Sequence, residues 1–174
     1  MKSEIDQQLN QAMLRLASDP KTIFVGQNVV YDGNVMFGHL ANIPLTQRLE
    51  LPVCEELQMG LCIGLSLQGL LPVSIYPRLD FLMRAMDQLV NHLDKLELMS
   101  NGQFKPKVII RTRVGGRKPL NAGPQHTQDH TEALRMMLTN VVVFKIVRAS
   151  DIFKTYAAAL ELPKPVLVVE AFGC

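Results

Sequence analysis

Apolar residues recur every three or four positions in several stretches of the chain, and short continuous apolar runs separate these stretches. In residues 3–18 this spacing places Leu9, Met13 and Leu16 on one face, which predicts an amphipathic helix that ends before Pro20. The same spacing predicts further helices at 54–69, 79–99, 129–138 and 150–161. The continuous runs predict buried strands at 22–25, 72–76, 108–110, 141–147 and 166–170.

Helices alternate with strands along most of the chain, and the strands read as unbroken Val, Ile and Leu runs. This pattern predicts an α/β fold with three layers, α/β/α, around a mostly parallel sheet that is covered on both faces. Residues 27–50 are expected to be irregular, with a turn at Asp32-Gly33. Ligands bind outside the carboxyl ends of parallel strands, where the loops 26–33, 76–81 and 113–128 are expected.

The length of 174 residues indicates a single domain, 1–174, and a hydrophobic content of 48% is enough for a packed core. A net charge of +2 argues against nucleic acid as a partner. Polar and glycine residues interrupt the most hydrophobic window, 57–75, so no membrane span is expected. With only three cysteines and a polar start, the chain is expected to be a reduced cytoplasmic protein.

The residue pattern alone leaves the chemistry open. Glu55 is explained by favourable charge at a helix start, Phe81 by the core, and His126 either by the surface or by general acid–base catalysis. No metal site is expected, because His126 and His130 have no third ligand nearby. The pair at 117–118, Arg and Lys, is either solvated or suited to an anionic substrate. No nucleotide-phosphate loop and no nucleophile elbow is present.

Several segments, in the same order, resemble the pyrimidine-binding domain of thiamine-diphosphate enzymes. The most similar form is the beta subunit of the decarboxylase component of 2-oxo acid dehydrogenases, such as pyruvate dehydrogenase, and the transketolase central domain is next. The segments that carry the resemblance are LPVCEELQMGLCIGLSLQGLLPV (51–73), DFLMRAMDQLVNHLDKLELMSNGQF (80–104), VIIRTRVGG (108–116), GPQHTQD (123–129) and KPVLVVE (164–170).

The resemblance implies a role for three side chains. Glu55 matches the glutamate that hydrogen-bonds the aminopyrimidine ring of thiamine diphosphate and activates the cofactor. Phe81 matches the aromatic residue that packs on that ring. His126 matches the histidine that handles protons beside the bound 2-oxo acid or ketose. Glu55 and His126 are therefore the expected catalytic residues, and Glu55 and Phe81 the expected cofactor contacts.

Two departures from the family pattern bear on partners. The chain has no GDG motif, so the diphosphate and its Mg²⁺ are expected on a separate diphosphate-binding subunit. The family's C-terminal domain is also missing, which fits either a naturally split subunit or a truncated piece. The resemblance thus implies a homodimer within a heterotetramer that catalyses decarboxylation or two-carbon transfer. The alternative is a non-catalytic assembly or regulatory domain that retained the fold.

Overall fold

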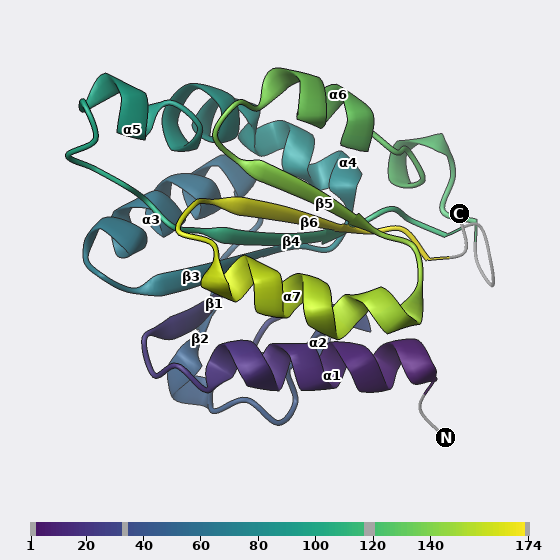
Figure 1. Ribbon diagram of the computed structural model, residues 1–174. Helices are drawn as coiled ribbons and strands as arrows, with labels where there is room; N and C mark the ends of the chain where they lie inside the picture. The colour runs from purple at the N-terminus through teal and green to yellow at the C-terminus, as the bar shows by residue number, and fades with distance from the viewer. Residues whose placement is uncertain (1–2, 33–34, 117–120, 173–174) are drawn as a thin grey trace.

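A computed structural model describes residues 3–32, 35–116 and 121–172, and its centre is one six-stranded sheet (Figure 1). All neighbouring strands are parallel, in the order β2-β1-β3-β4-β6-β5. The strands are β1 Thr22–Gly26, β2 Arg48–Glu50, β3 Leu71–Tyr76, β4 Ile109–Arg113, β5 Val142–Ile146 and β6 Val166–Glu170. The expected parallel sheet is therefore confirmed.

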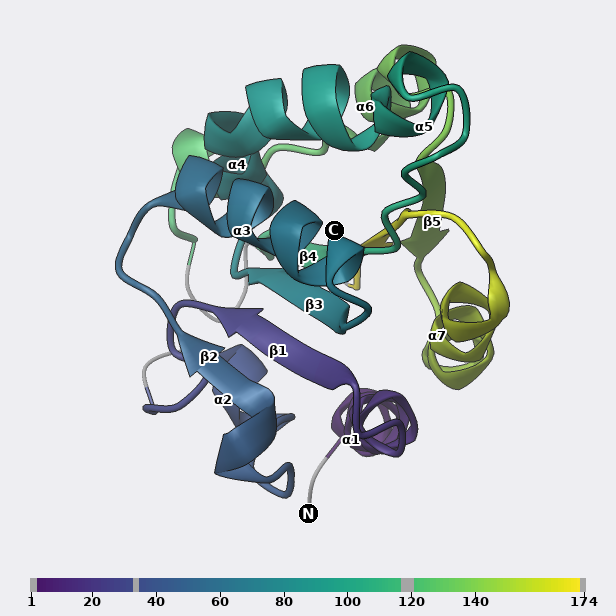
Figure 2. The same ribbon diagram turned by 90° about the vertical axis from the view of Figure 1, so that its left-hand side faces the viewer.

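Helices cover both faces of this sheet and complete the three layers (Figures 1 and 2). One face carries α1, α2 and α7, and the other carries α3 to α6. Their bounds are α1 Glu4–Ala17, α2 Val35–Gly38, α3 Glu55–Leu67, α4 Leu79–Leu82, α5 Leu96–Met99, α6 Thr131–Met137 and α7 Ile152–Glu161. Two separate apolar cores result, one on each side of the strands. Within the described residues, no helix is both long enough and apolar enough to span a membrane.

The prediction of one continuous α-helix over 79–99 is wrong, because the hydrogen-bond pattern changes along this segment. The structure divides it into α4, a 3-10 turn at Met83–Ala85, a π-helical stretch at Asp87–Leu93, and α5. The apolar face is nevertheless the expected one, since Leu79, Leu82 and Leu89 are buried. Spacing identifies the buried face, but neighbouring 3-10, α and π turns place nearly the same residues on it.

The region expected to be irregular contains a short strand, a short α-helix and a 3-10 turn at Leu45–Gln47, and the sequence pattern predicted none of the three. Strand β2 has only three residues, all half-buried, and helix α2 has four. Neither is long enough to show a period, which is why the pattern gave no signal for them.

The carboxyl ends of β1, β3 and β4 lie side by side, because the three strands are parallel neighbours. We call this side of the sheet its carboxyl edge, and the loops expected to bind a ligand start here. The connection from β1 leads outward to β2, whereas β3 leads in the opposite direction to β4. The sheet order therefore switches between β1 and β3, which is where open α/β sheets bind ligands. Gln58 of α3 fixes the helix at this point, because its amide nitrogen lies 3.0 Å from both Ser74 Oγ and the Ile75 carbonyl oxygen.

A network of buried charged and polar side chains lies between the sheet and the helices α1 and α7. Arg111 of β4 donates to Glu170 of β6 at 2.7 Å, and the Tyr156 hydroxyl of α7 donates to the same carboxylate at 2.7 Å. His39 accepts from Arg111 at 2.9 Å through Nδ1 and contacts Asp6 of α1 at 3.1 Å through Nε2. Burial and the Arg111 guanidinium lower the pKa of His39, so the ring is neutral at pH 7.

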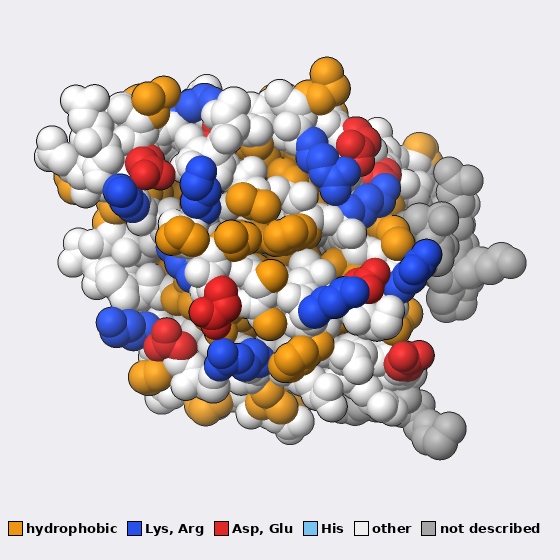
Figure 3. All heavy atoms as spheres, in the orientation of Figure 1, with side chains coloured by type: hydrophobic (Ala, Val, Ile, Leu, Met, Phe, Trp, Pro, Cys, Tyr) orange, Lys and Arg blue, Asp and Glu red, His pale blue; other side chains and the backbone are white. Residues whose placement is uncertain are grey.

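Strand β5 forms one edge of the sheet. Figure 3 shows the surface of the molecule on the side where β5 lies. Hydrophobic side chains gather in the middle of this surface, and charged side chains lie around them. On the edge strand itself Lys145 is exposed and pairs with Asp129 at 2.6 Å. A charged side chain on an edge strand discourages pairing with other chains.

The start of β5 is anchored by one buried carboxylate. Asp94 accepts hydrogen bonds from the backbone N–H groups of Thr139, Asn140 and Val141, at 2.7 to 3.1 Å. Burial opposes the charge, but bonds from Lys95 and these three amides outweigh it and lower the pKa of Asp94 to about 2.

We expect Asp94→Asn to lower the free energy of unfolding by roughly 1–3 kcal/mol, because an amide NH₂ replaces an acceptor facing backbone donors. The pKa of Asp94 is depressed from 3.8, so its stabilisation is present above pH 3.8 and is lost as the pH falls toward 2. Urea denaturation at pH 7 and at pH 3 measures both effects. The control is Asp87→Asn, an exposed acid on the same segment. Equal stability of the two variants at pH 7 would contradict this role.

Candidate functional site

Glu55 is the first residue of α3, where a negative charge is favoured by the helix dipole. Its side chain is only 8% exposed. The Tyr76 hydroxyl at the end of β3 donates to the Glu55 backbone carbonyl at 3.2 Å. This bond holds the first turn of α3 against the carboxyl edge of the sheet, so the position of Glu55 is set by two elements.

A cavity of about 370 Å³ opens beside Glu55. It is lined by Val53, Cys54, Glu55, Glu56 and Arg84. The Nε atom of Arg84 lies 3.8 Å from the Glu55 carboxylate, and the Arg84 side chain is 81% exposed. The cavity therefore presents a mostly buried acid that a ligand can reach from the solvent side.

Phe81 and His126 form a second part of the site at the same edge. Phe81 belongs to α4, after β3, and His126 ends the 3-10 turn Pro124–His126. Their rings meet edge to face, with centroids 5.5 Å apart and planes at 90°. Both side chains are half-buried. An edge-to-face contact of this kind fixes the orientation of an imidazole beside an aromatic face.

The backbone at His126 is held against Gly115, which follows β4. A side-chain carbon on Gly115 would lie 1.8 Å from the His126 carbonyl oxygen. No residue other than glycine fits there without movement of the loop. Gly115 is therefore a positioning residue for His126.

Two polar atoms near this contact are buried without a hydrogen-bond partner in the described structure, namely His126 Nδ1 and Asp80 Oδ2. The other carboxylate oxygen of Asp80 accepts from Gln128 at 2.9 Å. Unpaired buried polar atoms are uncommon and are often explained by a ligand or by catalysis. The sequence pattern did not single out Asp80 or Gln128, although Asp80 lies in the segment DFLMRA and Gln128 in the segment QHTQ.

The structure brings Phe81 and His126 together and places Glu55 beside Arg84. The cavity at Glu55 is not lined by Phe81 or His126. Arg84 was also missed from the sequence. It follows Phe81 by three positions, and that spacing on a helical segment is the signal that could have found it. The pair at 117–118 lies outside the described residues.

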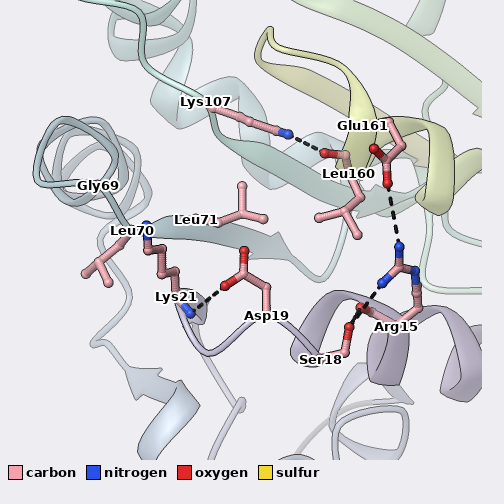
Figure 4. Close-up of a pocket in the computed structure, with 10 residues that line it drawn as sticks. All are labelled: Arg15, Ser18, Asp19, Lys21, Gly69, Leu70, Leu71, Lys107, Leu160 and Glu161. Atoms are coloured by element: carbon pink, nitrogen blue, oxygen red, sulfur yellow. Dashed lines mark hydrogen bonds and ion pairs between the residues drawn. The ribbon is translucent and has the colours of Figure 1, made fainter.

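A larger cavity, of about 490 Å³, lies at the amino ends of the strands, on the opposite side of the sheet from the carboxyl ends (Figure 4). Several of its polar groups make structural contacts. Arg15 pairs with Glu161 at 3.5 Å and donates to Ser18, and Lys107 donates to the Leu160 carbonyl at the end of α7. This cavity is therefore not the candidate site.

Comparison with known proteins identifies the family. Residues 2–171 match the family described as "Transketolase, pyrimidine binding domain". The chain belongs to this family. The resemblance carried by the five sequence segments is thereby confirmed, and so is the expected class of fold.

Among curated proteins, the chain is 26% identical to the pyruvate dehydrogenase E1 component subunit beta of Acholeplasma laidlawii, over 95% of this chain and 50% of that protein. It is 31% identical to the mitochondrial subunit beta of Chaetomium thermophilum, over 93% of this chain and 43% of that protein. The chain thus spans about half the length of these relatives.

Solved structures show the same fold. A structure named "Split gene transketolase, inactive beta4 tetramer" matches with a TM-score of 0.72 at 20% identity, over 96% of this chain and 50% of that one. The transketolase from Leishmania mexicana matches with a TM-score of 0.72 at 15% identity, over 94% of this chain and 24% of that one.

We expect Gly115→Ala to displace His126 and to separate its ring from Phe81. The ring-current shift that Phe81 imposes on the His126 ring protons measures the contact in an NMR spectrum, and it should largely disappear. The matched control is Gly64→Ala within α3, where a side-chain carbon would meet nothing within 4 Å. That change should leave the His126 signals in place and stabilise the helix by about 1 kcal/mol. An unshifted His126 spectrum in Gly115→Ala would show that the close contact does not position the ring.

Proposed function

We propose that the chain is the pyrimidine-binding subunit of a cytoplasmic thiamine-diphosphate enzyme, and that it works with a separate diphosphate-binding chain. The observation that carries this proposal is the buried Glu55 carboxylate on a cavity wall at the carboxyl edge of the sheet, in a chain of the pyrimidine-binding family. A buried acid that a ligand can reach suits a hydrogen bond to a ring nitrogen.

We infer that Glu55 and Phe81 would hold the aminopyrimidine half of the cofactor. Glu55 would hydrogen-bond a ring nitrogen and exchange a proton with it, and Phe81 would pack on the ring face. When bound, thiamine diphosphate supplies a carbon nucleophile for attack on the carbonyl carbon of a 2-oxo acid or a ketose. His126 would hold or move a proton at the substrate, because the two ring nitrogens of an imidazole can donate and accept one.

The diphosphate half is proposed to come from the partner chain, together with the Mg²⁺ that neutralises it. The absence of a GDG motif from this sequence supports that division. Val53, which lines the cavity at Glu55, is 77% exposed, and Leu57 at the start of α3 is 52% exposed. Exposed apolar side chains of this kind favour coverage by protein, which is consistent with a homodimer within a heterotetramer.

The substrate class is proposed from the chemistry and from the relatives. The relatives are named as subunits of pyruvate dehydrogenase and of 3-methyl-2-oxobutanoate dehydrogenase, and both names specify a 2-oxo acid. Decarboxylation of a 2-oxo acid is therefore the first reaction to assay, and two-carbon transfer from a ketose is the second.

We expect Glu55→Gln to lower turnover by about 100-fold or more, because an amide cannot exchange a proton with the ring. The assay follows loss of the 2-oxo acid by the complete complex, and size-exclusion chromatography verifies that the variant still assembles. The control is Glu132→Gln, an exposed acid in the first turn of α6 that does not line the cavity, which should keep turnover within about twofold of the native level. Equal turnover in both variants would refute the assignment of Glu55.

Affinity purification of the tagged chain from its native cells tests the partner directly. We expect mass spectrometry to identify a chain with a GDG motif, and to detect thiamine diphosphate in the purified complex. Recovery of this chain alone, without cofactor, would favour the alternative of a non-catalytic assembly or regulatory domain.

A further inference from the structure

Arg84 is the charged neighbour of Glu55, and nothing in the family resemblance assigns it a role. Its Nε atom lies 3.8 Å from the Glu55 carboxylate, which is an ion-pair distance but longer than a hydrogen bond. The two side chains differ in environment, since Glu55 is 8% exposed and Arg84 is 81% exposed. The guanidinium therefore stands on the solvent side of a buried acid.

The same chain segment positions Arg84 and Phe81. Phe81 lies in α4, and Arg84 follows it in the 3-10 turn Met83–Ala85. Arg84 also lines the cavity that opens onto Glu55. A ring that enters this cavity and bonds to Glu55 must share the carboxylate with the guanidinium or replace it.

We propose that Arg84 is a displaceable counter-ion of Glu55. Its guanidinium pairs with the Glu55 carboxylate in the free chain and is displaced when the cofactor's aminopyrimidine ring binds. Arg84 thereby sets how tightly the ring binds and does not take part in the chemistry. This inference rests on the proposed function and adds a positioning residue to it.

Two physical features make the displacement feasible. The pair has no hydrogen bond and its arginine stands in solvent, so salt screens it and little is lost when it opens. Glu56 is exposed and lines the same cavity, so it offers the guanidinium a second carboxylate after it leaves Glu55.

The test is calorimetric titration of thiamine diphosphate with Mg²⁺ into the tagged chain together with the proteins that co-purify with it, after bound cofactor and metal have been removed by dialysis against a chelator. We expect Arg84→Gln to bind the cofactor about two- to fivefold more tightly than the native protein at low ionic strength. Arg84→Lys keeps the charge and should remain near the native affinity. Arg135→Gln, which removes a surface arginine on α6, is the matched control and should change nothing.

Salt dependence separates this role from a merely structural one. The test compares the dissociation constant of the native protein with that of Arg84→Gln. Their ratio should fall toward one as salt is raised from about 0.01 M to about 1 M, because the screening length falls from about 30 Å to about 3 Å. A structural effect of the substitution would leave this ratio constant.

The possible results are distinguishable. Normal binding by the native protein with equal or weaker binding by Arg84→Gln would overturn the counter-ion role and leave the proposed function standing. No binding by the native protein and its co-purified chains would overturn the proposed function, and the inference about Arg84 with it.

Discussion

The buried ion pair between Arg111 and Glu170 is the interaction on which the carboxyl edge of the sheet depends. It joins the neighbouring strands β4 and β6, and each side chain is at most 3% exposed. Removing two charges from water costs several kcal/mol per ion, and further hydrogen bonds to the pair offset part of that cost. Tyr156 and His39 provide two such bonds, whereas Arg111 Nη1 has no partner among the described residues. The two bonds extend the constraint to α7 and to the loop after α2.

This constraint reaches the candidate site through the chain itself. Strand β4 ends at Arg113, two residues beyond Arg111, and Gly115 follows directly after Val114. Val114 continues the pairing, since its N–H donates to the Glu170 carbonyl at 2.9 Å. The backbone that supports His126 is therefore fixed by the same two strands that the ion pair joins. Glu170 keeps a lowered pKa despite its burial, because Arg111 and Tyr156 stabilise the charge.

The sequence predicted the larger elements because each has a clear physical cause. Runs such as VLVVE at 166–170 are buried on both faces, and only a covered parallel strand explains them. Helical spacing identified the buried face of 79–99 but not its turn type, because a π turn such as Asp87–Leu93 shifts the hydrogen bonds without exposing the apolar side chains. Strand β2 could not be predicted, since a three-residue edge strand has no period.

The candidate site was predictable only in part, for a similar reason. Residue types alone gave ordinary explanations for Glu55, Phe81 and His126, and the family resemblance singled them out. Arg84 and Asp80 depend on which segments meet in space. The three-residue spacing from Phe81 points to Arg84, but neither spacing nor composition reports that the turn after α4 meets α3. Tertiary proximity also converts Gly115 from a loop residue into the support of His126.

Under the proposed function, the two parts of the site differ in how firmly they are held, and the difference suits their tasks. Glu55 is fixed by the start of a 13-residue helix and by Tyr76, so its carboxylate keeps one position relative to a ring nitrogen. His126 lies on a loop and is held by one backbone contact and one ring contact. A rigid acid preserves the geometry that the cofactor needs, while a histidine on a loop can follow the substrate as its bonds change. The division of the fold into sheet-anchored and loop-anchored residues is thus also a division of chemical roles.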